Sequence, residues 1–122
     1  EIFPIVTDES VPEIKMTILE RDGGFVIDKN NCDMAQLDAD KLSLPLSLRR
    51  WQNADRFRPL GLRGSKLVSD FFNDIGLTTF EKKNTWIMID NKGTIVWVVG
   101  RRIDDRFKIT EKTSRVCQIN LE

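Results

Sequence analysis

Two apolar runs separated by a short turn constrain the fold of this chain more than any other feature. Residues 85–90 and 94–99 carry bulky apolar side chains, and Asn91-Lys92-Gly93 between them has the composition of a hairpin turn. The same criteria predict further strands at residues 14–19, 25–27, 34–42 and 114–121. Runs that are joined as hairpins, without alternating helices, predict a β-rich α+β domain with mostly antiparallel strands.

Alternation within these runs predicts which side chains enter the core. In the second apolar run it places Trp97 on one face together with Ile95 and Val99. In the last strand it directs Cys117 inward, where a free cysteine behaves as a small hydrophobic residue.

One main helix is predicted from Ser65 to Gly76. The apolar residues of this stretch recur at helical spacing and form one face: Leu67, Val68, Phe71, Phe72 and Ile75. Ser65 is the predicted N-cap, and Gly76 is predicted to end the helix in the left-handed conformation.

The length and composition indicate a single folded domain. The chain has 122 residues, of which 40% are hydrophobic and 31% charged, values typical of a globular protein. Pro4 and Pro12 interrupt any pattern in residues 1–13, which we expect to be a linker or tail, with the domain spanning residues 14–122. The chain starts without Met, so we expect it to be part of a longer protein. No apolar run reaches the ~20 residues of a membrane span, and two cysteines without secretory features fit a cytoplasmic protein.

Catalytic and metal-binding chemistry finds little support in the sequence. The chain has no histidine, which removes the commonest general base, and two distant cysteines do not make a zinc site. Residues 61–66 lack the spacing of a nucleotide-binding P-loop, and no nucleophile elbow of the Gly-x-Ser-x-Gly type occurs. We therefore predict that the chain contributes no catalytic residue, no metal ligand and no cofactor site.

Charge is distributed very unevenly along the chain. Residues 1–48 hold ten acids and four bases, a net charge of −6, whereas residues 49–122 hold nine acids and fifteen bases, a net charge of +6. Six of these bases lie in residues 49–66 beside one acid, Asp55, and a second basic group occupies residues 101–108. A short echo, Asp-Arg-Phe followed by a base, occurs in both groups, at residues 55–58 and 105–108. Such concentration is a hint of an anionic partner. The alternative, which charge alone favours, is a solvated surface whose charges balance within the domain.

Physical chemistry favours phosphate as the ligand of these bases. Arginine forks match phosphate oxygens, the glycines at positions 61 and 64 allow close backbone approach, and a helix N-terminus adds positive potential. The predicted surface consists of Arg56, Arg58, Arg63, Ser65, Lys66, Arg101, Arg102, Arg106 and Lys108. The alternative is that some of these arginines pair with Asp55, Asp70, Asp104 or Asp105 and brace loops.

Two stretches resemble the C-terminal domain of tRNA-Ile lysidine synthetases, the TilS family. Residues 50–72 carry an Asp-Arg-Phe turn, a Pro-Leu-Gly segment and a Ser-Asp-Phe-Phe helix. Residues 95–110 carry the family's Trp-Val-x-Gly-x-Arg-Ile-Asp element. The two motifs occur in the family's order, and the resemblance covers residues 40–120.

The resemblance implies a layered, β-rich domain, shared with part of a phenylalanyl-tRNA synthetase subunit, that holds tRNA toward its acceptor stem. It implies a parent enzyme that uses ATP to join lysine to the wobble cytidine of the isoleucine tRNA with a CAU anticodon. ATP would bind in an N-terminal catalytic domain outside this chain, so the chain alone is expected to be inactive. Expected partners are this tRNA and the enzyme's own N-terminal domain, with no membrane. The alternative function is a scaffold whose basic surface docks on the catalytic domain without touching RNA.

The chain departs from the family pattern in two places. Ala54 stands where the family usually has glycine, so the turn before Asp55 is predicted not to need a positive φ. Residues 76–83 replace the family's Lys-Ile-Pro-Arg segment, so tRNA contacts that relatives make there are not carried over to this chain.

Overall fold

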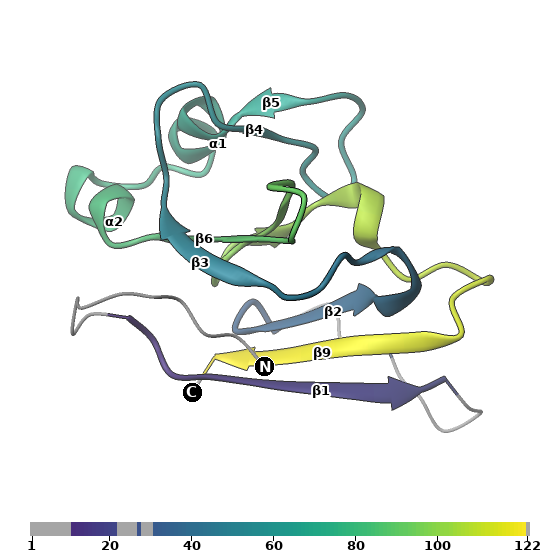
Figure 1. The fold of residues 1–122 in the computed structure, drawn as a ribbon. Coiled ribbons are helices and arrows are strands. Elements are labelled where there is room, and N and C mark those ends of the chain that lie inside the picture. Colours follow the sequence, from purple (N-terminus) through teal and green to yellow (C-terminus); the bar gives the residue numbers. More distant parts are fainter. Residues whose placement is uncertain (1–10, 22–26, 28–30, 122) are drawn as a thin grey trace.

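The computed structural model describes residues 11–21, 27 and 31–121, whose strands form antiparallel sheets arranged in layers (Figure 1). The lower, three-stranded sheet has the order β1-β9-β2, with bounds Ile14–Glu20, Arg115–Leu121 and Met34–Asp38. The four-stranded sheet has the order β3-β6-β7-β8, with bounds Ser47–Arg50, Trp86–Ile89, Ile95–Val98 and Arg102–Ile103. A hairpin of β4 and β5, Arg56–Phe57 and Lys66–Leu67, lies above it.

The helices are short. Helix α1 spans Val68–Asp74 and α2 spans Thr79–Lys83, and two 3-10 turns, η1 and η2, span Ala39–Lys41 and Asp105–Phe107. None of the helices in the described residues is long and apolar enough to cross a lipid bilayer. With α1 packed on a mostly antiparallel β framework, the α+β prediction is confirmed.

The four-stranded sheet is buried on both faces. On one face, Trp97 and Met88 pack with Leu37, Cys117 and Ile119 of the lower sheet in the first core cluster. The second core cluster fills the opposite face, where the sheet meets α1 and the β4–β5 hairpin, and it consists of Phe57, Val68, Phe71, Phe72, Ile87, Ile95 and Val98. Cys117 is fully buried, as predicted, and burial raises the pKa of its thiol to about 11.

A β-bulge decides which residues of β7 face each cluster. Met88 pairs with Trp97, but the next residue, Ile89, pairs with Ile95, so Val96 is the extra residue. A bulge places two successive side chains on the same side of a strand, and Val96 and Trp97 both pack in the first cluster. The predicted shared face of Ile95, Trp97 and Val99 is therefore wrong for Ile95, which packs in the second cluster.

The strands predicted at residues 14–19 and 114–121 are confirmed as β1 and β9. The strand predicted at residues 34–42 is shorter, because it ends at Asp38, whose carboxylate accepts the Asp40 N–H and starts η1. The strand predicted at residues 25–27 lies outside the described residues, apart from Ile27. Most of the expected linker, residues 1–10, lies outside them as well, so that boundary stays a prediction.

The predicted start of the main helix is wrong. Lys66 and Leu67 pair with β4 as β5, and the Val68 N–H donates to the Asp55 carbonyl over 2.8 Å. The helix therefore begins at Val68, its N-cap is Leu67, and no side chain caps it. The predicted end is confirmed, because Gly76 follows the helix with a φ of +73°.

Helix α2 lies in the segment where the family resemblance breaks down. Thr78 and Glu81 form a reciprocal capping box, in which the Glu81 N–H donates to the Thr78 hydroxyl over 3.1 Å and the Thr78 N–H donates to the Glu81 carboxylate over 2.9 Å. The Thr-x-x-Glu spacing is visible in the sequence, so this helix start was accessible to prediction.

Thr78, which caps α2, and Ser65, the cap predicted from the sequence, should differ in their contribution to stability. Thr78→Ala should lower the free energy of unfolding by about 1 kcal/mol, because it removes a side-chain acceptor from the first turn of α2. Ser65→Ala, the matched control, should change it by less than about 0.5 kcal/mol, because Ser65 is exposed and caps nothing. Urea denaturation of both variants measures the difference, and an equal loss in Ser65→Ala would contradict the assigned start of α1.

Candidate nucleic-acid interface

The fold brings the two basic segments of the sequence together. Pro59 and Asp104 form an antiparallel bridge, and the Leu60 N–H donates to the Ile103 carbonyl over 3.1 Å. The Asp105 N–H donates to the Arg58 carbonyl over 2.6 Å. Residues 58–65, here called the basic loop, are thereby attached to the segment that contains the second basic group.

The carboxylate of Asp104 holds this junction. Asp104 is 0% exposed and accepts the backbone N–H groups of Arg58 and Arg106, each over 2.8 Å. It also accepts Nε and Nη2 of Arg106, each over 2.9 Å. The hydrogen-bonded carboxylate raises the pKa of Arg106 above its ordinary value. For Arg106 the alternative stated from the sequence therefore holds: its guanidinium is paired with Asp104 and braces the loop.

In the turn before β4, the carboxylate of Asp55 is bound by Arg49 and not by Arg56, its neighbour in the sequence. Arg49 donates two hydrogen bonds to Asp55, over 2.8 and 2.9 Å, and the Gln52 N–H donates to the same carboxylate over 2.7 Å. Burial alone would raise the pKa of Asp55, but these hydrogen bonds outweigh it and hold that pKa below its ordinary value. Asp55 is therefore occupied, and Arg56 donates instead to the Ser65 hydroxyl over 3.1 Å.

The prediction that the turn before Asp55 does not need a positive φ is wrong. Ala54 has a φ of +73°, in the left-handed region, although it is not a glycine. The hydrogen bonds on either side of it, from Gln52 to the Asp55 carboxylate and from the Asp55 N–H to the Gln52 carbonyl, hold the turn in this conformation.

The predicted phosphate-binding residues divide into two groups. In the first, the cation contacts a carboxylate: Lys66 with Asp74, Arg101 with Glu81 at 3.8 Å, Arg106 with Asp104, and Lys108 with Asp105 at 3.4 Å. In the second group, the cation contacts no carboxylate of the described residues. Arg56 contacts Ser65, and the Arg102 guanidinium lies 5.1 Å from the centre of the Phe71 ring. Arg58 and Arg63 are exposed, and the described part of the chain offers their side chains no ion pair or hydrogen bond.

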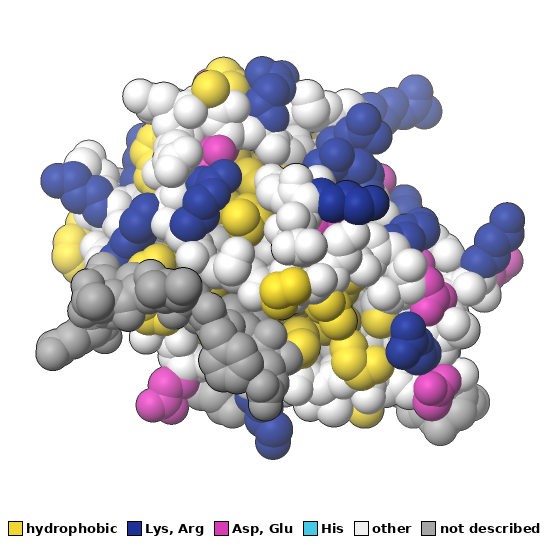
Figure 2. Space-filling model, viewed as in Figure 1, with side chains coloured by type: hydrophobic (Ala, Val, Ile, Leu, Met, Phe, Trp, Pro, Cys, Tyr) yellow, Lys and Arg dark blue, Asp and Glu magenta, His cyan; other side chains and the backbone are white. Residues whose placement is uncertain are grey.

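The predicted contribution of a helix N-terminus is wrong. Strand β5 separates the basic loop from α1, which has only seven residues and begins at Val68. The positive potential of this region comes from side chains instead. Figure 2 shows Lys and Arg side chains gathered over the upper part of the molecule, which carries the β4–β5 hairpin and α1 in the same view. Gly61 and Gly64 both have positive φ, at +86° and +72°, so they shape the basic loop.

Arg50 is a basic residue with a defined position in the structure that was not predicted as a site residue. The Arg50 guanidinium lies 3.9 Å from the centre of the Trp86 ring and donates to the Lys83 carbonyl over 3.1 Å. Its partners lie more than thirty residues away, so no local pattern could have assigned it this position.

Comparison with known proteins gives a consistent result. Residues 46–121 match a family model described as the TilS substrate C-terminal domain. The chain is 47% identical over 96 residues to a tRNA(Ile)-lysidine synthase of Parabacteroides distasonis, covering 79% of this chain and 22% of that protein. It is 38% identical to the same enzyme of Bacteroides thetaiotaomicron, covering 69% and 20% of the two chains. The chain thus spans about a fifth of the length of these relatives.

Solved structures show the same fold. A crystal structure of a TilS C-terminal domain superimposes with a TM-score of 0.73 at 22% identity, covering 88% of this chain and 80% of that one. An N-terminal fragment of the phenylalanyl-tRNA synthetase β-subunit from Pyrococcus horikoshii superimposes with a TM-score of 0.61 at 17% identity, covering 70% and 27%.

The role of Asp104 predicts a large difference between two adjacent carboxylates. Asp104→Asn should lower the free energy of unfolding by roughly 1.5–3 kcal/mol. Each carboxylate oxygen of Asp104 accepts two N–H donors, and in the variant an amide NH2 group, which cannot accept, replaces one oxygen and leaves its buried donors unsatisfied. Asp105→Asn is the control, since Asp105 is partly exposed and its ion pair with Lys108 is worth less than about 1 kcal/mol. Thermal and urea denaturation measure both, and equal losses would remove Asp104 from this role.

Proposed function

Since this chain belongs to the family of TilS substrate C-terminal domains, we propose that it is the tRNA-binding part of a tRNA(Ile)-lysidine synthase. In this proposal the whole enzyme joins lysine to the wobble cytidine of the isoleucine tRNA with a CAU anticodon, using ATP, in the cytoplasm. ATP binds in the enzyme's N-terminal catalytic domain, and this chain contributes tRNA affinity but no catalytic residue. Its partners are the tRNA and that catalytic domain.

Two arginines of the basic loop that have no ion pair or hydrogen bond to the described residues carry the proposal. Arg58 and Arg63 are exposed and contact no carboxylate of the described residues, while the loop backbone is anchored to the second basic group. Cations held in place without an intramolecular counter-ion bind phosphate oxygens without first breaking an ion pair. We assign Arg56 and Arg102 to the same proposed surface, because within the described residues neither of them contacts a carboxylate.

Three further cations can join this surface when RNA binds. Lys66, Arg101 and Lys108 have side chains that are 34–49% exposed and pair with carboxylates that are also partly exposed. Exposed ion pairs contribute only about 0–1 kcal/mol, so exchanging the carboxylate for a phosphate costs little. Arg106 differs, because its carboxylate is fully buried and would be left without its cation.

Contacts on this surface are expected with the RNA backbone and not with base edges. The major groove of an RNA duplex is too deep and narrow for side chains to read, whereas its phosphates are accessible. Such contacts position a tRNA without identifying its sequence, so discrimination among tRNAs falls to other parts of the enzyme.

The competing function is a scaffold that docks on the catalytic domain of its own enzyme. One observation weakens the RNA-binding proposal relative to it, because four of the predicted bases already form ion pairs with carboxylates of this chain and leave less free positive charge for RNA: Lys66, Arg101, Arg106 and Lys108. The two functions differ in salt dependence, since only a nucleic acid releases a condensed layer of counter-ions on binding.

Replacing Arg58 and Arg63 tests the proposal directly. In the Arg58→Ala/Arg63→Ala variant, tRNA affinity should fall by at least about tenfold, since a hydrogen bond to a charged group contributes roughly 1.5–3 kcal/mol. The slope of log affinity against log salt should become shallower by about two, one for each lost phosphate contact. Titration of the chain with a tRNA transcript at several salt concentrations measures both quantities.

The matched control removes the same charge elsewhere. Lys92 and Lys112 are exposed bases outside the basic loop and outside residues 101–108, so Lys92→Ala/Lys112→Ala should leave affinity and salt slope close to the parent values. If the arginine variant and this control behave alike, the basic loop is not the tRNA surface and the scaffold function becomes the better description.

A further inference from the structure

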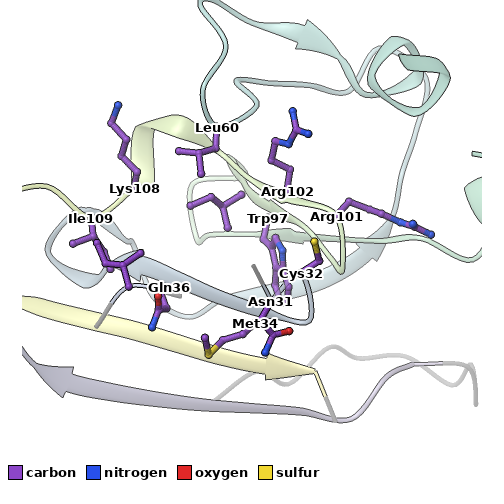
Figure 3. Close-up of a pocket in the computed structure, with 12 residues that line it drawn as sticks. Asn31, Cys32, Met34, Gln36, Leu60, Trp97, Arg101, Arg102, Lys108 and Ile109 are labelled. Atoms are coloured by element: carbon purple, nitrogen blue, oxygen red, sulfur yellow. The ribbon is translucent and has the colours of Figure 1, made fainter. Parts of the chain in front are cut away.

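A cavity of about 600 Å³ lies between the lower sheet and the junction of the two basic segments (Figure 3). Its walls are mainly apolar and come from separate parts of the fold, namely Leu60 of the basic loop, Ile103 of β8, Met34 of β2, Trp97 of β7 and Ile109. This volume falls in the range of about 300–1,000 Å³ that is typical of binding sites for small organic groups.

The cavity opens at the edge of the candidate phosphate surface. Arg102 and Lys108 line it, but in Figure 3 their charged ends point upward and away from Met34 and Gln36, so their aliphatic parts form the rim. Leu60, on the same side as Arg102, is 40% exposed. On the opposite side the cavity is lined by two amides, Asn31 and Gln36, and Gln36 also donates to the Gln118 side chain over 3.2 Å.

We propose that this cavity takes one unpaired nucleotide of a bound RNA, with the base between the apolar walls and its phosphate at the cationic rim. The proposal rests on the proposed function, because the neighbouring surface must first hold the RNA backbone. A base fits this combination of groups, since its faces are apolar and its edges carry donors and acceptors that amides can meet. A purely apolar ligand would gain nothing from the Arg102 and Lys108 cations beside the cavity. A paired base has its faces stacked and cannot enter.

The test compares two hairpin RNAs of the same stem, one blunt and one with a single-stranded tail of four nucleotides. The parent chain should bind the tailed hairpin about tenfold more tightly, which corresponds to the burial of roughly 55 Å² of apolar surface. Leu60→Trp fills the cavity mouth and should abolish this gain while the affinity for the blunt hairpin stays the same.

Leu62→Trp is the matched control, because Leu62 lies on the same loop with a similar exposure, 43%, but does not line the cavity. It should keep the affinity of the parent for both hairpins. If Leu60→Trp keeps the gain, or if the parent shows none, the nucleotide site is excluded. If the parent chain does not bind the blunt hairpin at all, the result counts against the phosphate surface instead, so the two proposals fail in different ways.

A chemical reporter at the cavity gives a second readout that does not depend on the Leu60 variant. Cys32 is exposed and lines the cavity, whereas Cys117 is buried with a thiol pKa raised to about 11, so alkylation at neutral pH reports on Cys32. The tailed hairpin at saturation should slow alkylation of Cys32 at least about fivefold relative to the blunt hairpin, as expected when a bound group covers an otherwise accessible thiol. Equal rates with both hairpins would overturn the proposal. Protection by the free mononucleotide alone would place a free nucleotide, not an RNA nucleotide, in the cavity and would overturn it too.

Discussion

The buried carboxylate of Asp104 is the interaction on which the candidate surface depends. A carboxylate that is removed from water costs several kcal/mol unless hydrogen-bond donors surround it. Asp104 obtains three of its four donors from Arg106, two residues away, and the fourth from the Arg58 N–H, on a segment distant in sequence. That last donor ties the basic loop to the second basic group, so one buried charge sets the spacing between the two halves of the surface.

The central sheet explains why this junction is rigid. The four-stranded sheet is covered on one face by the lower sheet and on the other by α1 and the β4–β5 hairpin, so its two central strands, β6 and β7, are apolar throughout. The bulge at Val96 makes this possible, because it turns Ile95 toward α1 while Trp97 remains in the layer between the sheets. The Asp104 N–H donates to the Val96 carbonyl over 2.9 Å, which joins the bulge directly to the basic junction.

Ion pairing within the surface separates cations that brace the fold from cations that are available to a ligand. Arg49 and Arg106 hold carboxylates that are mostly or fully buried, and both are in effect part of the framework. Arg58 and Arg63 contribute nothing comparable to the described structure, so their positive charge is available to a partner. A count of basic residues in the sequence cannot make this distinction, because it depends on the position of each carboxylate in space.

The sequence by itself determined the features that are set by neighbouring residues. The hairpin of β6 and β7, the left-handed end of α1 at Gly76 and the concentration of bases in residues 49–66 follow from local composition and periodicity, and the structure contains all three. The tertiary structure decided the rest. Residues 66 and 67 carry helical spacing but form β5, because pairing with β4 satisfies their backbone groups. Arg49 rather than Arg56 takes Asp55, Ala54 adopts a positive φ, and the cavity assembles from segments far apart in the chain. The cavity depends on contacts between distant residues, and β5 depends on its pairing with β4. The turn at residues 52–55 is local, but its conformation depends on which side chain reaches the Asp55 carboxylate, and neither kind of contact leaves a periodic trace in the sequence.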